Sequence, residues 1–329
     1  MAHELASLAN GRAAMAYVGQ TPWHSLGQPL TSGADIETWR TEAGLNFDVL
    51  STPVQYMNGS MHTMAGRNVL YRSDNNEALS VVSDRYNIVQ PGQVLDFFKE
   101  LVDTAGFTLE TAGVLGGGKK VWALAKVNEG ADVIGHDTVR PYILLATSFD
   151  ATLATTAKFT AVRVVCNNTL TMSTGGSESD LITGPVVQSV KVLHSDRFDA
   201  RAVRQQLGVV VNSFDRFMVN SRLLAYKELS LAHAQDLTFK LIEPLTSIPK
   251  GKPEKDVRST HNYKRILELF SGKAIGYDLA GPTAWGWLNS VTELVDHERG
   301  KNPSTRMDSA WFGSGDAMKN RALELALTA

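Results

Sequence analysis

Residues 141–173 place cationic and hydroxyl side chains among β-branched residues, which suits the binding of a polyanion. The threonines alternate or nearly alternate with apolar residues, and this period of two is typical of strands with one solvated face. Lys158 and Arg163 lie in the same run, and their odd separation places them on opposite faces of an unbroken strand. One of the two must therefore lie near an edge, be paired, or be displaced by a bulge. The stretch is either an ordinary half-buried sheet or a sheet whose polar face meets a phosphate-bearing ligand.

Two further groups of cations could extend such a surface. Lys119 and Lys120 follow three glycines, but an apolar, strand-like run comes next, so the pattern predicts a hairpin turn and not a nucleotide-binding phosphate loop. Spacings of four and three place three arginines on one helix face, where the alternative is a solvated face neutralised by Asp196 and Asp199. The predicted nucleic-acid-binding residues are Lys119, Lys120, Lys126, Lys158, Arg163, Arg197, Arg201 and Arg204.

Motifs for metal or covalent chemistry are weak in this sequence. The eight histidines are scattered without HExxH or paired spacing, so we expect no metal and no cofactor. The single cysteine, Cys166, excludes an internal disulfide and a CxxC zinc site. Cys166 could act as a nucleophile beside a distant histidine, which leaves a cysteine-dependent hydrolase as a third, disfavoured hypothesis. We therefore expect a binding protein in preference to an enzyme.

Charge is distributed unevenly along the 329 residues. The net charge is -2, yet residues 185–275 hold fifteen Lys or Arg against nine Asp or Glu. This local excess suggests a region able to meet a polyanion, although solvated helix faces are often rich in basic residues as well. No apolar run approaches the ~18 residues that a membrane span needs, and no signal peptide is visible. The sequence thus predicts a cytoplasmic protein without a membrane partner.

The order of predicted elements favours an α+β fold, with an antiparallel meander and hairpin sheet packed by helices and a mostly helical C-terminal half. A short helix with Asp35 near its N-cap comes first. Strand patterns then occupy 47–57, 62–73 and 78–89, with a turn at Asn58-Gly59, a helix starts at Pro91, and a hairpin surrounds the glycines at 116–118. The predicted divisions are an irregular N-terminal arm (1–34), an α+β sheet domain (35–184), a helical basic region (185–245), a linker (246–263) and C-terminal helices (264–329).

Five separated segments, in order, carry a resemblance to a known family. They are TPWHSLGQPL, YNIVQPGQVLDFF, GGGKKVWALAKV, VRVVCNNTL and TAWGWLNSVTELVDHERG. Together they resemble the phage and plasmid-like proteins grouped as domain of unknown function family 932. That resemblance implies a setting in mobile genetic elements of a bacterial host and supplies no catalytic residues. The meander, helix and hairpin followed by basic helices also look similar, as a fold-level analogy, to the Rad52 and RecT-like annealing proteins.

The leading hypothesis is a sequence-independent, ATP-independent protein that binds and anneals single-stranded DNA in homologous recombination. It would act as a homo-oligomer, with a phage-encoded nuclease as a further candidate partner. The alternative is a phage or plasmid structural or protein-interaction protein that binds no nucleic acid. Its anchors would be Trp285, Trp287 and Trp311, for which core packing is the competing interpretation.

Overall fold

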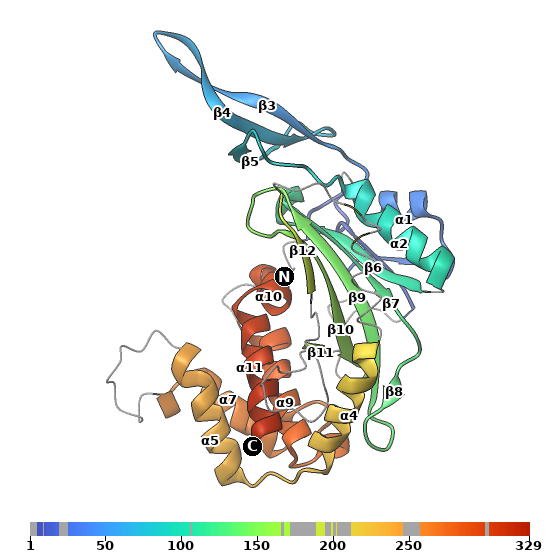
Figure 1. Ribbon diagram of the computed structural model, residues 1–329, viewed down its shortest axis with the longest axis vertical. Coiled ribbons are helices and arrows are strands. Elements are labelled where there is room, and N and C mark those ends of the chain that lie inside the picture. The colour runs from blue at the N-terminus through green and yellow to red at the C-terminus, as the bar shows by residue number, and fades with distance from the viewer. Residues whose placement is uncertain are drawn as a thin grey trace. The chain divides into compact units, whose positions relative to one another are not determined.

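The computed structural model describes residues 5–8, 10–19, 26–105, 107–165, 168–171, 189–194, 199, 202, 212–245, 257–299 and 303–329. Its contacts divide the chain into two compact units, each built from discontinuous segments (Figure 1). Unit 1 comprises Met1–Val127, Tyr142–Lys158 and Ser189–Gly208, and unit 2 comprises Asn128–Pro141, Phe159–Gln188 and Val209–Ala329. Because the units interleave along the chain, their bounds differ from the consecutive divisions expected from the sequence.

The largest sheet is antiparallel apart from one edge pair, and its strands are hydrogen-bonded in the order β11-β10-β9-β7-β6-β1-β2. β12 also pairs with β10, and β8 pairs with β9. The strands are β1 (Met15–Val18), β2 (Gln28–Leu30), β6 (Thr108–Leu115), β7 (Lys120–Lys126), β8 (Ala131–Asp132), β9 (Thr138–Ser148), β10 (Thr155–Arg163), β11 (Asn168–Thr171) and β12 (Ser189–Val192). The α+β class is confirmed, as is the β6–β7 hairpin, whose turn is the glycine run Gly116–Gly118.

The predicted meander forms a separate three-stranded sheet in unit 1, in the order β3-β4-β5. Its strands are β3 (Val49–Asn58), β4 (Ser60–Arg72) and β5 (Ala78–Ser83), with Gly59 at a positive φ between the first two. Only glycine adopts that conformation without strain, which is why the Asn58-Gly59 pair marks the turn. Figure 1 shows β3 and β4 extending together beyond β5.

Two helices of unit 1 begin where their sequence signals place them. α1 (Ile36–Glu42) is capped by Asp35, whose side chain accepts a hydrogen bond from the Thr38 amide and whose pKa is lowered by that bond. α2 (Pro91–Ala105) starts at a proline, which loses no hydrogen bond in the first helical turn. Both predicted helices are confirmed.

The N-terminal arm is more regular than the sequence indicated. β1 pairs antiparallel with β6, and β2 pairs parallel with β1 at the sheet edge. Gly113 on β6 makes this approach possible, because a Cβ there would lie 2.9 Å from the Ala14 carbonyl oxygen. The predicted irregular arm is therefore wrong for these two strands, since pairing with β6 overrides the local turn signals.

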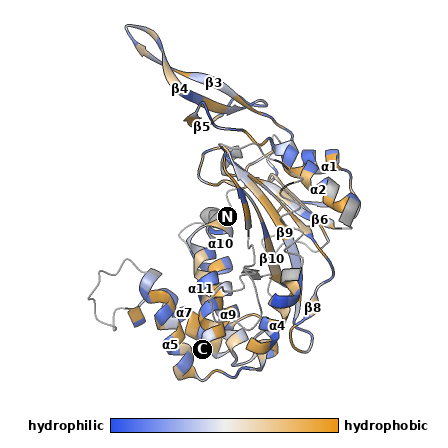
Figure 2. Ribbon diagram, in the orientation of Figure 1, coloured by the Kyte–Doolittle hydropathy of each residue, from blue (hydrophilic) through white to orange (hydrophobic). Residues whose placement is uncertain are grey.

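Unit 2 is mainly helical. Its helices are α4 (Asn212–Tyr226), α5 (Leu231–Ile242), α7 (His261–Glu268), α8 (Tyr277–Ala280), α9 (Ala284–Glu293), α10 (Pro303–Phe312) and α11 (Ser314–Thr328). α9 contacts α4, α7 and α11, and every one of its residues is buried. Figure 2 shows that the helices of unit 2 carry both hydrophobic and hydrophilic residues. The C-terminal helices are confirmed, whereas the supposed helical region at 185–245 includes strand β12. Residues 246–256 of the expected linker lie outside the described residues, and its last residues belong to α7, which Thr260 caps.

Candidate interaction surface

Arg163, one of the predicted phosphate-binding residues, lies in the interior of unit 2. Its guanidinium donates to both carboxylate oxygens of Asp137, Nε to Oδ1 at 2.7 Å and NH2 to Oδ2 at 2.8 Å. The two side chains are 1 % and 0 % exposed. Of the three arrangements expected for Lys158 or Arg163, the structure shows that Arg163 is paired. Because the pair is buried, the Arg163 side chain cannot reach a phosphate in solution.

The same pair holds two other parts of unit 2, helix α9 and the segment at Gly276, and a further hydrogen bond joins these two to each other. Trp285 on α9 donates from Nε1 to Asp137 Oδ2 at 2.8 Å. Arg163 NH2 donates to the Gly276 carbonyl at 2.9 Å, where a Cβ on residue 276 would lie 3.0 Å from that nitrogen. Glu293 of α9 accepts from the Ile275 amide at 2.9 Å, which fixes the same segment from the other side. Trp285 and Arg163 thus form one hydrogen-bonded centre.

β10 is buried along nearly its whole length, including Lys158 and Thr155, Thr156 and Thr160. The Thr155 hydroxyl is shared with Thr147 on β9 at 2.9 Å. The expectation of a solvated polar face is therefore wrong for this strand. Threonine alternation indicated a strand correctly, but a hydroxyl bonded within the interior has the same sequence pattern as one in water.

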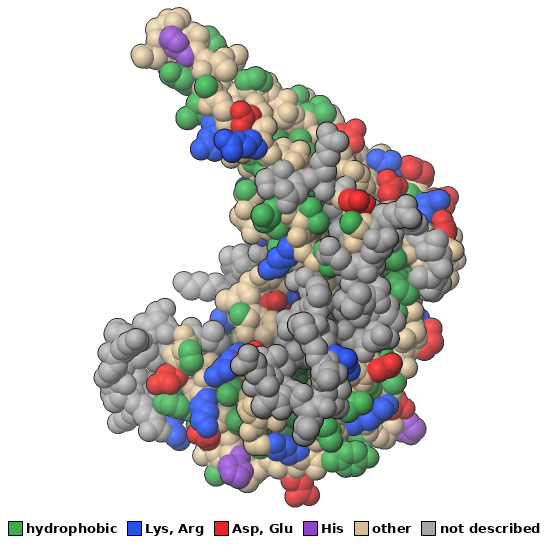
Figure 3. All heavy atoms as spheres, in the orientation of Figure 1, with side chains coloured by type: hydrophobic (Ala, Val, Ile, Leu, Met, Phe, Trp, Pro, Cys, Tyr) green, Lys and Arg blue, Asp and Glu red, His purple; other side chains and the backbone are tan. Residues whose placement is uncertain are grey.

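Of the remaining predicted phosphate-binding residues, the structure describes the three lysines of the β6–β7 hairpin and not the three arginines. On the β6–β7 hairpin Lys119 is exposed, while Lys120 and Lys126 are half-buried and interact with other groups. Arg197, Arg201 and Arg204 lie outside the described residues, as does Cys166. On the face drawn in Figure 3, Lys and Arg side chains are dispersed among Asp and Glu.

Of the three tryptophans considered as partner anchors, Trp285 and Trp287 are fully buried and Trp311 is half-buried. The Trp287 indole donates to the Thr238 hydroxyl at 2.9 Å. The core-packing interpretation is thereby confirmed for Trp285 and Trp287, and any exposed anchors must be sought elsewhere.

The β3–β4 ribbon, residues 49–72 of unit 1, has the most conspicuous exposed surface. Among the described residues, the outer part of β4 up to Gly66 pairs with β3 and with no other strand, because β5 ends opposite Arg67. The pairing register shifts between Pro53 and Gln55, where four residues of β4 (64–67) face one residue of β3, and Gly66 within this bulge has a positive φ. Both faces and both edges of the outer ribbon are thus open to solvent.

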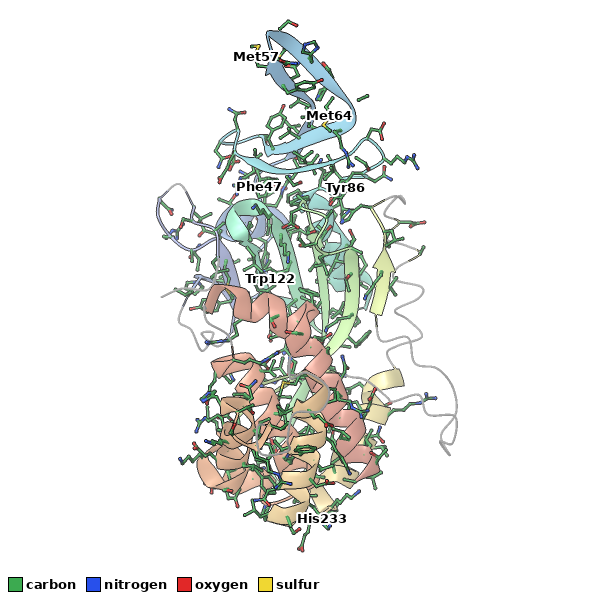
Figure 4. All side chains as sticks on the ribbon, turned by 90° about the vertical axis from the view of Figure 1, so that its left-hand side faces the viewer. Phe47, Met57, Met64, Tyr86, Trp122 and His233 are labelled. Atoms are coloured by element: carbon green, nitrogen blue, oxygen red, sulfur yellow. The ribbon has the colours of Figure 1, made fainter. Side chains whose placement is uncertain are left out.

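The side chains of the ribbon are apolar or neutral. Met57 and Met61 oppose each other beside the turn and are 69 % and 58 % exposed, and Met64 is exposed further along (Figure 4). Tyr56 stacks on His62 with ring centroids 5.4 Å apart. No charged residue occurs between Asp48 and Arg67. Methionine and tyrosine are typical of protein interfaces, and edge strands left to water usually carry charges instead.

The base of the ribbon is fixed to the body of unit 1. Arg72, at the end of β4, is buried over the Phe47 ring at 3.9 Å and donates to Asp74 and to the Gly117 carbonyl. The Arg72 guanidinium holds the pKa of the Asp74 carboxyl below its usual value. Gln90 binds both the amide and the carbonyl of Val49, at 2.8 and 3.0 Å. The ribbon therefore projects from a well-anchored base.

A comparison with known families gives one match. The model described as Domain of unknown function (DUF932) matches residues 78–322, well over half of the chain. The chain belongs to this family. No curated protein and no solved structure matches it. The DUF932 match begins at Ala78, the first residue of β5, so the β3–β4 ribbon precedes the matched region.

Two features are absent from the part of the chain that the structure describes. These residues contain no cluster of histidine, cysteine and carboxylate side chains suited to a metal ion. They also contain no helix with the length and hydropathy of a membrane span.

The assignment of Arg163 to the interior can be tested by replacing it with methionine. The Arg163→Met variant leaves the Asp137 carboxylate buried without a compensating charge, so the free energy of unfolding should fall by about 3–5 kcal/mol in urea denaturation. Lys119→Met, at an exposed lysine, should change it by less than about 0.5 kcal/mol. Equal effects of the two substitutions would contradict the assignment.

The Glu293 carboxyl should make stability depend on pH. Burial raises the pKa of Glu293, so the folded chain takes up this proton more readily than the unfolded chain, and the contribution of Glu293 to stability is lost as the pH rises through the folded pKa. Glu293→Gln removes that dependence. Relative to the unsubstituted chain, the variant should gain stability at pH 7, and the gain should shrink toward pH 4.5 and below in thermal unfolding.

Glu268→Gln provides a control of opposite sign. Hydrogen bonds from Lys273 and Arg265 lower the pKa of Glu268, so its contribution to stability is present at neutral pH and is lost on acidification. Glu268→Gln should therefore destabilise the chain at pH 7 and lose this effect in acid. A pH-independent difference for Glu293→Gln would refute the assigned cause.

Proposed function

We propose that this chain is a protein-interaction protein, acting in the phage or plasmid setting that its resemblance suggests, and that it recognises another protein chain through the β3–β4 ribbon. The observation that carries the proposal is the uncharged, exposed run between Asp48 and Arg67, which displays Tyr56, Met57 and Met61. Contact with a protein would remove these side chains from water, at roughly 25 cal/mol per Å² of apolar surface.

Backbone chemistry supports the same proposal. A two-stranded hairpin without a third strand is only marginally stable in water, and its unpaired edge groups can accept another strand. The outer ribbon has this arrangement, whereas its base is covered and hydrogen-bonded through Arg72 and Gln90. A fixed base with an apolar, unpaired tip suits a recognition element, because a partner supplies the backbone and apolar contacts that the tip lacks on its own.

Photo-crosslinking in the bacterial host tests this function. With a benzophenone amino acid in place of Met57, we expect a discrete protein adduct, identified by mass spectrometry of the isolated band. Adding Met61→Glu should remove the adduct without changing the unfolding curve, because residue 61 is exposed. The same benzophenone placed at Lys99, an exposed residue of α2, is the control. No adduct at residue 57, or an identical adduct at residue 99, would refute the proposal.

Single-stranded DNA annealing is the second candidate, favoured by the three lysines on the β6–β7 hairpin. The exposure of Lys119 is the observation that supports it. The buried Arg163–Asp137 pair and the neutral ribbon weigh against a continuous phosphate track. A protein that anneals strands independently of sequence holds mainly phosphates, so its affinity must fall with salt.

Fluorescence titration with an oligonucleotide at two or more salt concentrations tests this second function. If the hairpin binds phosphates, Lys119→Ala should lower the slope of log affinity against log salt by about one. Lys99→Ala, which removes an exposed lysine of α2, should leave the slope unchanged. Absence of binding at low salt, or binding without a salt slope, would remove annealing from consideration.

A further inference from the structure

Two arginines of unit 2, Arg299 and Arg306, have no carboxylate partner among the described residues. Arg299 follows the π-helical turn Leu294–Glu298, which continues α9, and it is half-buried. Its Nη1 atom is buried without a hydrogen-bond partner. Arg306 on α10 donates from Nε to the Arg299 carbonyl at 3.2 Å, which is its only side-chain hydrogen bond within the described part of the chain. The Arg306 guanidinium therefore lies against the backbone of Arg299, and neither charge is neutralised there.

The carboxylates that precede Arg299 in the sequence bind other cations. Glu298 accepts two hydrogen bonds of 2.7 Å from the guanidinium of Arg265. Asp296 accepts a hydrogen bond of 2.9 Å from Lys319, and both side chains of this second pair are buried. The π-helical turn thus supplies its two acids to α7 and α11, and Arg299 is left without a counter-ion.

The difference between a paired and an unpaired arginine is also electrostatic. Hydrogen bonds to Glu298 raise the pKa of Arg265, whereas burial lowers the pKa of Arg299 with no opposing contribution from a carboxylate. Arginine nevertheless stays charged at neutral pH. A partly buried charge without a counter-ion is unfavourable, and unsatisfied groups of this kind in folded proteins commonly mark a bound ion or water. The surroundings of Arg299 are therefore those of an anion-binding residue.

We propose that Arg299 and Arg306 together bind one phosphate dianion, either as inorganic phosphate or as the terminal 5′-phosphate of a nucleic acid. A phosphate group carries a charge of roughly -1.5 to -2 at pH 7, which matches two guanidinium groups, whereas a carboxylate or a backbone phosphodiester would neutralise only one. Guanidinium groups also present N–H donors in a planar fork that fits phosphate oxygens. The site lies within unit 2 and is independent of the β3–β4 ribbon.

Thermal unfolding of the full chain with inorganic phosphate tests the site, with sodium chloride of equal ionic strength as the reference. Phosphate should raise the Tm of the unsubstituted chain, because a ligand that binds only the folded state stabilises it. Arg299→Met and Arg306→Met should each weaken phosphate binding by about tenfold or more in calorimetric titration, since each removes a charged hydrogen-bond donor.

Arg321→Met is the matched control for binding. Arg321 on α11 is exposed and paired with Glu324, so its removal should leave the affinity for phosphate unchanged. Stability without phosphate separates binding from folding. Arg299→Met should keep or raise the Tm, because it removes an unpaired charge, whereas Arg163→Met breaks a buried pair and should lower the Tm. A fall in the Tm of Arg299→Met as large as that of Arg163→Met would assign Arg299 a structural role and overturn the proposal.

Competition with oligonucleotides distinguishes the two sources of the phosphate group. If a 5′-phosphorylated oligonucleotide displaces inorganic phosphate and the same oligonucleotide with a 5′-hydroxyl does not, the ligand is a nucleic-acid end. If neither competes, the ligand is free phosphate. Equal competition by both would show that backbone phosphodiesters are sufficient, and the assignment of a dianion would then be wrong. The proposal also fails if phosphate raises the Tm no more than sodium chloride does, or stabilises Arg299→Met as much as the unsubstituted chain.

Discussion

The guanidinium of Arg163 and the carboxylate of Asp137 lie together in the interior of unit 2, and the residues around them are arranged to satisfy both charges. Desolvation of two ions is offset only when the geometry is bidentate and the remaining donors and acceptors find partners. The Trp285 indole and the Gly276 carbonyl meet that requirement. One pair therefore determines where the end of β10, the start of β9, the 274–276 segment and α9 can lie within the unit.

Because a buried carboxylate needs a paired cation, a Lys or Arg in a strand is not by itself a sign of a phosphate-binding surface. Arg163 and the exposed Lys119 are both cationic residues beside apolar, strand-like sequence, yet one satisfies an interior carboxylate and the other faces solvent. The informative surface lies where charge is missing. Exposed side chains are apolar along the β3–β4 ribbon, and also at Val219, Leu223 and Tyr226 on α4. Exposed positions in strands and helices usually carry Lys, Glu or Asp instead.

Sequence reasoning recovered most local elements, because their signals are local. Pro91 marks the start of α2, Asp35 caps α1, and Asn58-Gly59 marks the ribbon turn. Strands β1 and β2 were missed, since β1 depends on pairing with β6, which is distant in the chain, and β2 pairs in turn with β1. The interleaving of the two units was also hidden, because chain order says nothing of which segments pack together.

The surroundings of Arg163 and Trp285 were not predicted, again because their partners are distant in the sequence. The partner of Arg163 is twenty-six residues away and that of Trp285 is one hundred and forty-eight, and no periodicity joins them. The ribbon did have a sequence signal, namely the absence of charged residues between Asp48 and Arg67 in a predicted hairpin. That signal becomes informative only when β5 is seen to stop short of the tip, so that neither face is covered.

The way the ribbon is attached has a consequence for what its sequence can tolerate. The ribbon precedes the residues matched by the family model, and it joins the body of unit 1 at its base through the pairing of β4 with β5, through Arg72 and through Gln90. Such a hairpin can be lengthened, shortened or exchanged without repacking either core, since its outer part contributes nothing to them. The exposed surface of the tip is therefore free to change in size and chemistry while the body that carries it stays folded.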